Sequence, residues 1–179
     1  METLSRIAVP ATNQLNSESQ EILNGVKGQL GMVPNLYATI GYSSNALSSY
    51  LQFSGNAGKG TFSNKELEAI KLAVSEANGC AYCKAAHTAI AKMNGFTDEE
   101  TVQLRNATIA DEKLRALTLL AQETVENGGH ASEEAKERFF AQGYDEKALI
   151  DFVAVLTEIT FTNYAHGLTQ VEVDFPSVN

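Results

Sequence analysis

The chain contains two cysteines, Cys80 and Cys83, which lie three residues apart. A disulfide between them closes too small a loop to stabilise a fold of 179 residues. Secreted domains that depend on disulfides carry more cysteines, spaced across the chain. The pair therefore has little use as a structural cross-link, and its spacing indicates a dithiol that reacts.

Local sequence predicts that this pair lies at the start of a helix. Asn78-Gly79 directly precedes Cys80 and is typical of the end of the preceding helix. Residues three apart on a helix have Cα atoms ~5 Å apart, within the range that a disulfide accepts. Unpaired backbone N–H groups in the first helical turn stabilise a thiolate, which is the reactive form.

A histidine shares the predicted helix with the two cysteines. His87 lies four residues after Cys83 and seven after Cys80, so the three fall within a ~60° arc of one helix face. Ile90 continues this stripe, so we expect the face to point inward. A thiol pair beside an imidazole, on a partly buried face, can exchange protons and electrons.

Glu68 is the fourth candidate, on the helix predicted before the dithiol. The break at Asn78-Gly79 lets the two helices fold back on each other, so that Glu68 could reach the imidazole or a thiol. A carboxylate there would fix the histidine tautomer or accept a proton. The alternative is a solvated helix face that Glu68 shares with Lys65 and Lys71.

The elements that must position these residues are predicted to be helices. Apolar residues recur at helical spacing along most of the chain, and the only extended segment expected is a short tail at Val171, Val173 and Phe175. The sequence therefore predicts an all-α fold of about seven to nine helices in a single domain, residues 1–179. The predicted helix caps are Ser17, Ser44 or Asn45, Ser63, Thr97, Ser132 and Asp145.

The charge and the hydropathy of the sequence argue against two classes of partner, nucleic acids and membranes. The net charge of −9 is spread along the chain, which argues against nucleic acid and against an anionic membrane surface. No apolar run approaches the ~20 residues of a membrane span, and no apolar signal-peptide core follows Met1. We therefore expect a cytoplasmic protein without a membrane partner.

The four candidates also carry a family resemblance. Glu68, Cys80, Cys83 and His87 stand as Glu-x11-Cys-x2-Cys-x3-His, which resembles the signature of AhpD-like alkylhydroperoxidases in the carboxymuconolactone decarboxylase superfamily. Residues 30–37 resemble the N-terminal segment of proteins in its peroxidase-related branch, and residues 163–176 resemble their C-terminal segment. The resemblance implies an all-helical subunit that assembles into homo-oligomers, often trimers or hexamers. It also implies reduction of hydroperoxides without metal, haem or another cofactor.

The same resemblance implies a role for each residue. The cysteine at Cys83 attacks the peroxide, the one at Cys80 resolves the sulfenic acid into a disulfide, and Glu68 and His87 relay the proton. A lipoylated protein or a similar thiol donor then reduces the disulfide. Tyr82 stands where the best-known members have a histidine, which implies a simpler proton relay and a weaker peroxidase, or an oxidant other than peroxide. Tyr82 itself either packs or donates a hydrogen bond to the site.

Alternatives remain at the level of the site. Both cysteines could be buried apolar residues, and a lone histidine is often a core residue. Zinc is the main rival, because Cys80, Cys83 and His87 offer three of the four ligands of a structural site. The fourth would have to be His130, expected in a surface turn, or His166, expected in the core or at a helix cap.

Alternatives also remain at the level of function. Superfamily members include lactone decarboxylases that use no dithiol, and the cysteine pair argues against that assignment. A third hypothesis is a non-catalytic helical module that senses oxidation and signals through its oligomeric state. The leading hypothesis is an enzyme, a thiol-dependent peroxidase or dithiol oxidoreductase for small organic hydroperoxides.

Overall fold

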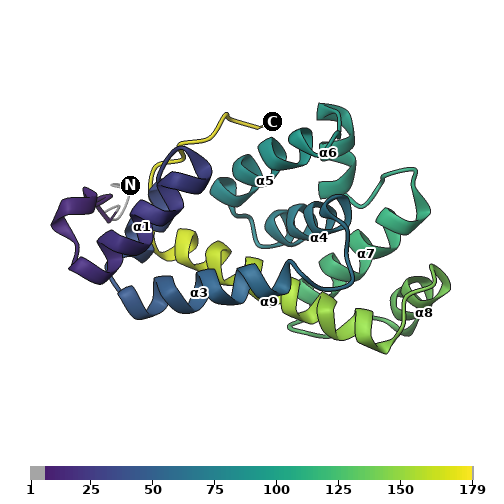
Figure 1. Cartoon of the computed structure of the whole chain (residues 1–179). Coiled ribbons are helices and arrows are strands. Elements are labelled where there is room, and N and C mark those ends of the chain that lie inside the picture. Colours follow the sequence, from purple (N-terminus) through teal and green to yellow (C-terminus); the bar gives the residue numbers. More distant parts are fainter. Residues whose placement is uncertain (1–6, 179) are drawn as a thin grey trace.

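The computed structural model describes residues 7–178 and is all-α, as predicted (Figure 1). Nine α-helices and one 3-10 turn, and no strand, occur in this range. Their bounds are Thr12–Gln14 for the 3-10 turn, then α1 Ser17–Leu30, α2 Asn35–Ile40, α3 Ser44–Ala57, α4 Asn64–Ala77, α5 Ala81–Met93, α6 Asp98–Arg105, α7 Glu112–Glu126, α8 Glu133–Ala141 and α9 Glu146–Thr169.

Four of the six predicted caps are observed. Ser63 and Thr97 form reciprocal capping boxes at α4 and α6, and Ser132 and Asp145 cap α8 and α9. Two caps differ by one position, because the observed caps are Asn16 for α1 and Ser43 for α3. Each neighbouring polar residue can cap equally well, so a run of them leaves the position undetermined.

The N-terminal region departs from the prediction at α2. Helix α1 ends at Gly31, which has a left-handed φ of 78°. The six-residue helix α2, which starts after Pro34, was not foreseen. A helix of this length is too short to show a periodic pattern.

Helix α4 is the centre of the packing and contacts α5, α6, α7 and α9. Ile70 and Val74 on α4 belong to the larger apolar cluster, and Ala69 and Leu72 belong to a smaller cluster with α5 and α6. Because α4 is covered on both sides, charged residues along it are drawn into the interior.

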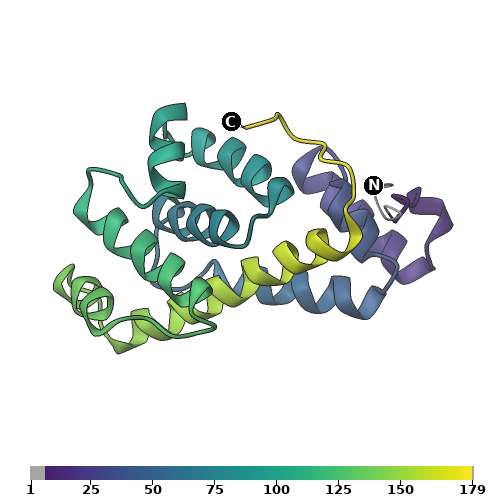
Figure 2. The ribbon, with the colours of Figure 1, turned by 180° about the vertical axis from the view of Figure 1, so that it is seen from behind.

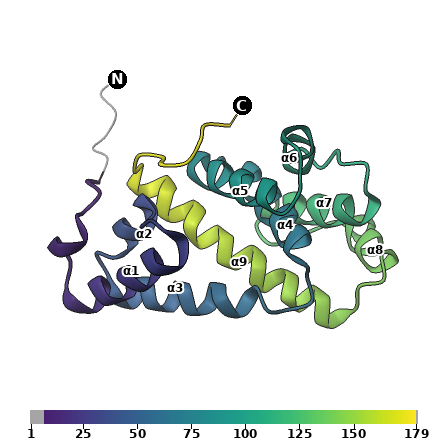
Figure 3. The same ribbon diagram turned by 45° about the horizontal axis from the view of Figure 1, so that its top comes forward.

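Helix α9 runs between a group formed by α1, α2 and α3 and a group formed by α4 to α8 (Figure 3). Its 24 residues include an 18-residue window with a mean hydropathy of 1.2, so by length and composition alone it could cross a membrane. This corrects the expectation that no segment is long and apolar enough for a membrane span. Phe152, Val155 and Ile159 on α9 are fully buried in the larger cluster, which is also the position of a core helix. After α9, residues 170–178 form neither helix nor strand and turn back past α5.

Candidate active site

A tight turn between α4 and α5 places the two cysteines. Gly79 adopts φ 65°, a left-handed conformation that favours glycine, and the Cys80 N–H donates to the carbonyl of Ser75 at 2.9 Å. On the other side of the turn, the Asn78 side chain donates to Oδ1 of Asn163 on α9 at 2.9 Å, and Asn163 Nδ2 donates to Ser75 Oγ at 3.3 Å. The turn is therefore fixed to α9 as well as to its own helices.

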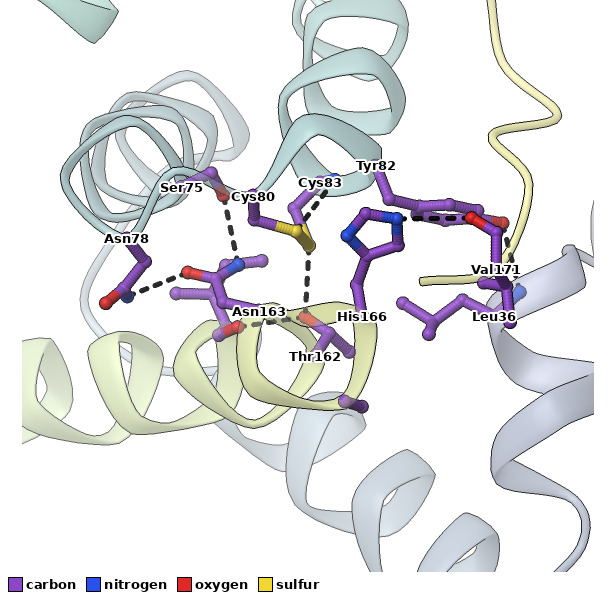
Figure 4. Close-up of a disulfide and its surroundings, with 12 residues drawn as sticks. Leu36, Ser75, Asn78, Cys80, Tyr82, Cys83, Thr162, Asn163, His166 and Val171 are labelled. Carbon is purple, nitrogen blue, oxygen red and sulfur yellow. Dashed lines mark hydrogen bonds between the residues drawn. A yellow bond between two sulfur atoms is a disulfide. The ribbon is translucent and has the colours of Figure 1, made fainter. Parts of the chain in front are cut away.

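The cysteines lie at the start of α5 and are joined as a disulfide, with Cα atoms 5.4 Å apart (Figure 4). Cys80 is the N-cap residue of α5, and its sulfur accepts the Cys83 N–H at 3.2 Å. Both residues are buried, with 3% of Cys80 and 2% of Cys83 exposed. Across from α5, the Thr162 hydroxyl on α9 lies 3.8 Å from Cys83 Sγ.

Glu68 and His87 form a direct pair between α4 and α5. Glu68 Oε2 lies 2.8 Å from His87 Nδ1, and both side chains are largely buried. Only 6% of Glu68 is exposed, so the solvated-face alternative does not describe it. A carboxylate on Nδ1 favours the tautomer with the proton on that nitrogen, which leaves Nε2 free to accept a proton.

A cavity of about 170 Å³ connects these groups. Cys83, Glu68 and His87 line it, whereas Cys80 does not, so one sulfur of the pair faces the cavity and the other lies behind it. Ile90 lines the cavity with Cys83 and His87, so it shares their face as expected, but it is 37% exposed and not buried. The face of α5 that carries Cys83, His87 and Ile90 is therefore buried at Cys83 and exposed to solvent at Ile90. Apolar side chains make up much of the remaining wall: Leu30, Pro34, Leu36, Ala86 and Phe175.

A second buried charge pair lines the same cavity and was missed at the sequence level. Lys71 Nζ on α4 lies 3.0 Å from Glu158 Oε2 on α9, and the Tyr50 hydroxyl donates to Glu158 Oε1 at 2.8 Å. The Tyr37 hydroxyl lies 3.4 Å from that of Tyr50. Burial alone would raise the pKa of Glu158, but the Lys71 charge and the Tyr50 hydrogen bond hold that pKa below its usual value. Glu158 was detectable as a charged residue inside the apolar stripe of α9.

Tyr82 attaches the C-terminal tail to the site. Its hydroxyl donates to Asp174 Oδ1 at 2.5 Å and accepts the Leu36 N–H at 3.3 Å, while Asp174 Oδ2 accepts the Asn35 N–H at 2.9 Å. Phe175 packs edge-on against the Tyr82 ring, with centroids 5.6 Å apart. Burial, and then the Asp174 carboxylate, raise the pKa of Tyr82, so the hydroxyl stays a donor.

The other two histidines lie apart from the Glu68–His87 pair. His166 on α9 is buried beside the Tyr82 ring, and its Nε2 lies 3.2 Å from the Val171 carbonyl oxygen (Figure 4). Burial lowers the pKa of His166. His130 is exposed, as expected for a surface turn. Within residues 7–178, no three His, Cys, Asp or Glu side chains converge on a point that could hold a metal ion.

Comparisons with known proteins place the chain in a family. The model of the carboxymuconolactone decarboxylase family matches residues 45–123, a range that contains all four motif residues. The uncharacterized protein YdfG of Bacillus subtilis is 31% identical over 100 residues, which cover 54% of this chain and 67% of YdfG. The chain belongs to the carboxymuconolactone decarboxylase superfamily.

Solved structures show that the chain has the AhpD-like fold of this superfamily. A peroxidase-related protein with an AhpD core from Ralstonia eutropha superposes with a TM-score of 0.82 at 20% identity, over 97% of this chain and 94% of the other. A peroxidase-related protein from Silicibacter superposes with a TM-score of 0.81 at 22% identity, over 93% and 90%. A cysteine-to-alanine variant of the debrominase Bmp8, bound to 2,3,4-tribromopyrrole, superposes with a TM-score of 0.78 at 20% identity, over 97% and 93%.

Proposed function

We propose that this superfamily member is a thiol-dependent peroxidase that reduces small organic hydroperoxides through the Cys80–Cys83 pair. One observation carries the proposal: Cys83 lines a cavity whose wall also holds the Glu68–His87 pair, while Cys80 lies behind it within bonding distance. A substrate in this cavity would meet one sulfur, an acid–base pair and apolar walls.

The reaction balances as a two-electron reduction of the O–O bond. In the reduced protein, the Cys83 thiolate attacks the terminal oxygen of ROOH, the O–O bond breaks, and the leaving alkoxide takes a proton to become the alcohol. Cys83 is then a sulfenic acid. The Cys80 thiol attacks the Cys83 sulfur, water leaves, and the disulfide forms. Two electrons have moved from the dithiol to the peroxide.

The Glu68–His87 pair is suited to the proton transfers. His87 can accept the thiol proton on Nε2 and return it to the alkoxide, while Glu68 on Nδ1 stabilises the transient imidazolium. The family's histidine before the second cysteine is replaced here by Tyr82, whose hydroxyl is occupied by Asp174 and Leu36. The relay proposed for this chain therefore consists of Glu68 and His87.

Cavity size and burial limit the partners that can react. A volume of about 170 Å³ with apolar walls suits a small, uncharged hydroperoxide. With 2% of Cys83 exposed, the flat surface of a protein cannot reach the sulfur. We therefore propose a thiol at the end of a narrow arm as the reductant, such as the dithiol of a lipoyl group on a carrier protein, acting in the cytoplasm.

We also propose that the chain forms homo-oligomers, such as trimers or hexamers, through the outer face of α9. Figure 2 shows α9 in front of α3, with its outer face turned to the viewer. Exposed apolar side chains lie at both ends of this face, three or four residues apart within each end, and the polar Thr157 separates the two groups; such a face suits contact with a second copy. The apolar side chains are Ile150, Val153, Phe161, Tyr164 and Leu168. Sedimentation of Leu168→Glu against the parent tests this, and an unchanged mass for the two proteins would refute it.

The decisive experiment for the activity counts thiols by mass spectrometry before and after one equivalent of cumene hydroperoxide. The parent should lose two hydrogens between Cys80 and Cys83, and Cys80→Ser should stop at a sulfenic acid that dimedone traps on Cys83. Cys83→Ser should consume no peroxide through the dithiol, and equal consumption by this variant and the parent would refute the proposal. Faster turnover of 2,3,4-tribromopyrrole than of any hydroperoxide would favour a debrominase instead.

A further inference from the structure

The Lys71–Glu158 pair lies outside the four-residue motif but shares the cavity with Cys83. Only 1% of Glu158 is exposed, and 14% of the Lys71 side chain. Lys71 is the only lysine or arginine among the described residues that line this cavity. Charges buried this deeply act over longer distances than surface charges, because little water screens them.

The charge of Lys71 is maintained from two sides. Burial alone would lower the pKa of Lys71, but Glu158 and then Glu68 raise it above its usual value. An ammonium ion is therefore held in the cavity wall at the pH at which thiols ionise. The opposing negative charge on Glu158 is held equally firmly by Lys71 and by the Tyr50 hydroxyl.

We propose that the Lys71–Glu158 pair sets the ionisation of the Cys83 thiol, with Lys71 favouring the thiolate and Glu158 limiting that effect. A positive charge near a thiol stabilises its deprotonated form, and a negative charge does the opposite. Both residues are positioning residues, since neither is required to touch the peroxide. The role rests on the proposed function, in which Cys83 is the sulfur that attacks.

Other titratable groups face the same space and remain in every variant below. They are Glu68 on α4, Tyr82 and His87 on α5, Tyr37 on α2 and Tyr50 on α3. His166 on α9 and Asp174 in the tail do not line the cavity but contact Tyr82 from behind its wall. The Cys80 sulfur accepts the Cys83 N–H at the N-terminus of α5, so that helix end acts on Cys80 first. The groups left to act on the Cys83 sulfur are the Thr162 hydroxyl and the charges in the cavity wall.

The test measures the rate at which iodoacetamide alkylates reduced Cys83 as a function of pH, in a Cys80→Ser background. Glu158→Gln keeps the shape of the side chain and an acceptor for Tyr50, and leaves Lys71 uncompensated. The apparent pKa of Cys83 should fall by about one unit, which raises alkylation about tenfold below the parent's pKa. Lys71→Gln should raise that pKa by about one unit.

A charge effect shifts the apparent pKa of Cys83 in opposite directions in Glu158→Gln and Lys71→Gln. A structural disturbance of the cavity would shift that pKa in the same direction in both variants. Lys113→Gln is the matched control, because Lys113 pairs with Glu66 of α4 at 2.9 Å and lies outside the cavity. Lys113→Gln should leave the pH dependence of Cys83 alkylation unchanged. If Lys71→Gln does not fold, Glu158→Gln decides the question alone.

An unchanged or raised pKa of Cys83 in folded Glu158→Gln would overturn the inference. Alkylation requires no peroxide, so this result is independent of whether the protein is a peroxidase. Conversely, opposite shifts without any peroxide-dependent thiol loss would support the electrostatic role of the pair and refute the proposed function.

Discussion

Replacing Tyr82 by phenylalanine should loosen the C-terminal tail without changing the shape of the core. Tyr82 is 3% exposed, and its ring contacts with His166 and Phe175 need no hydroxyl. The hydroxyl itself supplies the hydrogen bond to Asp174, at 2.5 Å. Tyr82→Phe therefore removes one charge-assisted hydrogen bond between α5 and the tail and leaves the apolar contacts in place.

The size of the effect follows from that bond. A hydrogen bond to a charged group contributes about 1.5–3 kcal/mol. At about 1.4 kcal/mol for each factor of ten, the detached state of the tail should become about 10- to 100-fold more populated. The Leu36 N–H also loses its acceptor, which adds to the effect. The global fold should lose no more than this local amount.

Hydrogen exchange at the Asn35 amide measures the detachment. Asn35 donates to Asp174 Oδ2, an acceptor that Tyr82→Phe does not alter, so faster exchange there reports release of the tail. Exchange should rise about 10- to 100-fold, and dithiothreitol should reduce the buried disulfide faster, because Phe175 leaves the cavity wall.

Tyr42→Phe serves as the control, since the Tyr42 hydroxyl is exposed and donates to the Ala8 carbonyl at 3.0 Å, far from Asp174 in the sequence. It should leave exchange at Asn35 unchanged. Equal exchange at Asn35 in Tyr82→Phe and the parent would show that the hydroxyl does not hold the tail, and would refute the reasoning.

Three further predictions concern the acid–base pair, the core and a buried carboxylate. Glu68→Gln should lower the rate of peroxide-dependent oxidation about 10- to 100-fold in stopped-flow assays, and a parental rate would contradict the proposed relay. Phe139→Ala, at a fully buried ring stacked on Tyr144, should cost about 3–5 kcal/mol in urea unfolding, and a loss below that of a surface substitution would contradict this packing. Burial raises the pKa of Glu66, but hydrogen bonds from Tyr144 and Ser63 outweigh burial and lower it from 4.5 to about 2. The stability from ionised Glu66 is therefore present above about pH 4.5 and lost towards about pH 2, and Glu66→Gln should remove that dependence from urea midpoints measured against pH.

The local parts of the site could be predicted from the sequence. The Asn78-Gly79 break, the Cys80 cap and the four-residue motif lie within twenty residues, and helix geometry over that distance is regular. The fold class and most caps follow from equally local patterns. Ile90 was misjudged because one helix face runs from the core to the surface, which spacing alone does not reveal.

The remaining walls of the cavity could not be predicted from the sequence, because they depend on contacts between segments that are distant in the chain. Asn35 and Asp174 are separated by 139 positions, and Tyr50 and Glu158 by 108. No local periodicity encodes such pairs. Lys71 was grouped with solvated residues because its partner lies on α9, whose packing against α4 becomes visible only in three dimensions.

The division of the site between a short hairpin and distant elements has a consequence for how such proteins can diversify. The α4–α5 hairpin holds both sulfurs and the Glu68–His87 pair, whereas Tyr37, Thr162 and Phe175 come from three other parts of the chain. Substitutions in those outer parts can reshape the cavity while the hairpin with the two cysteines and the Glu68–His87 pair stays intact. In such a scaffold, the substrates that the cavity accepts can change while the dithiol and its neighbours stay the same.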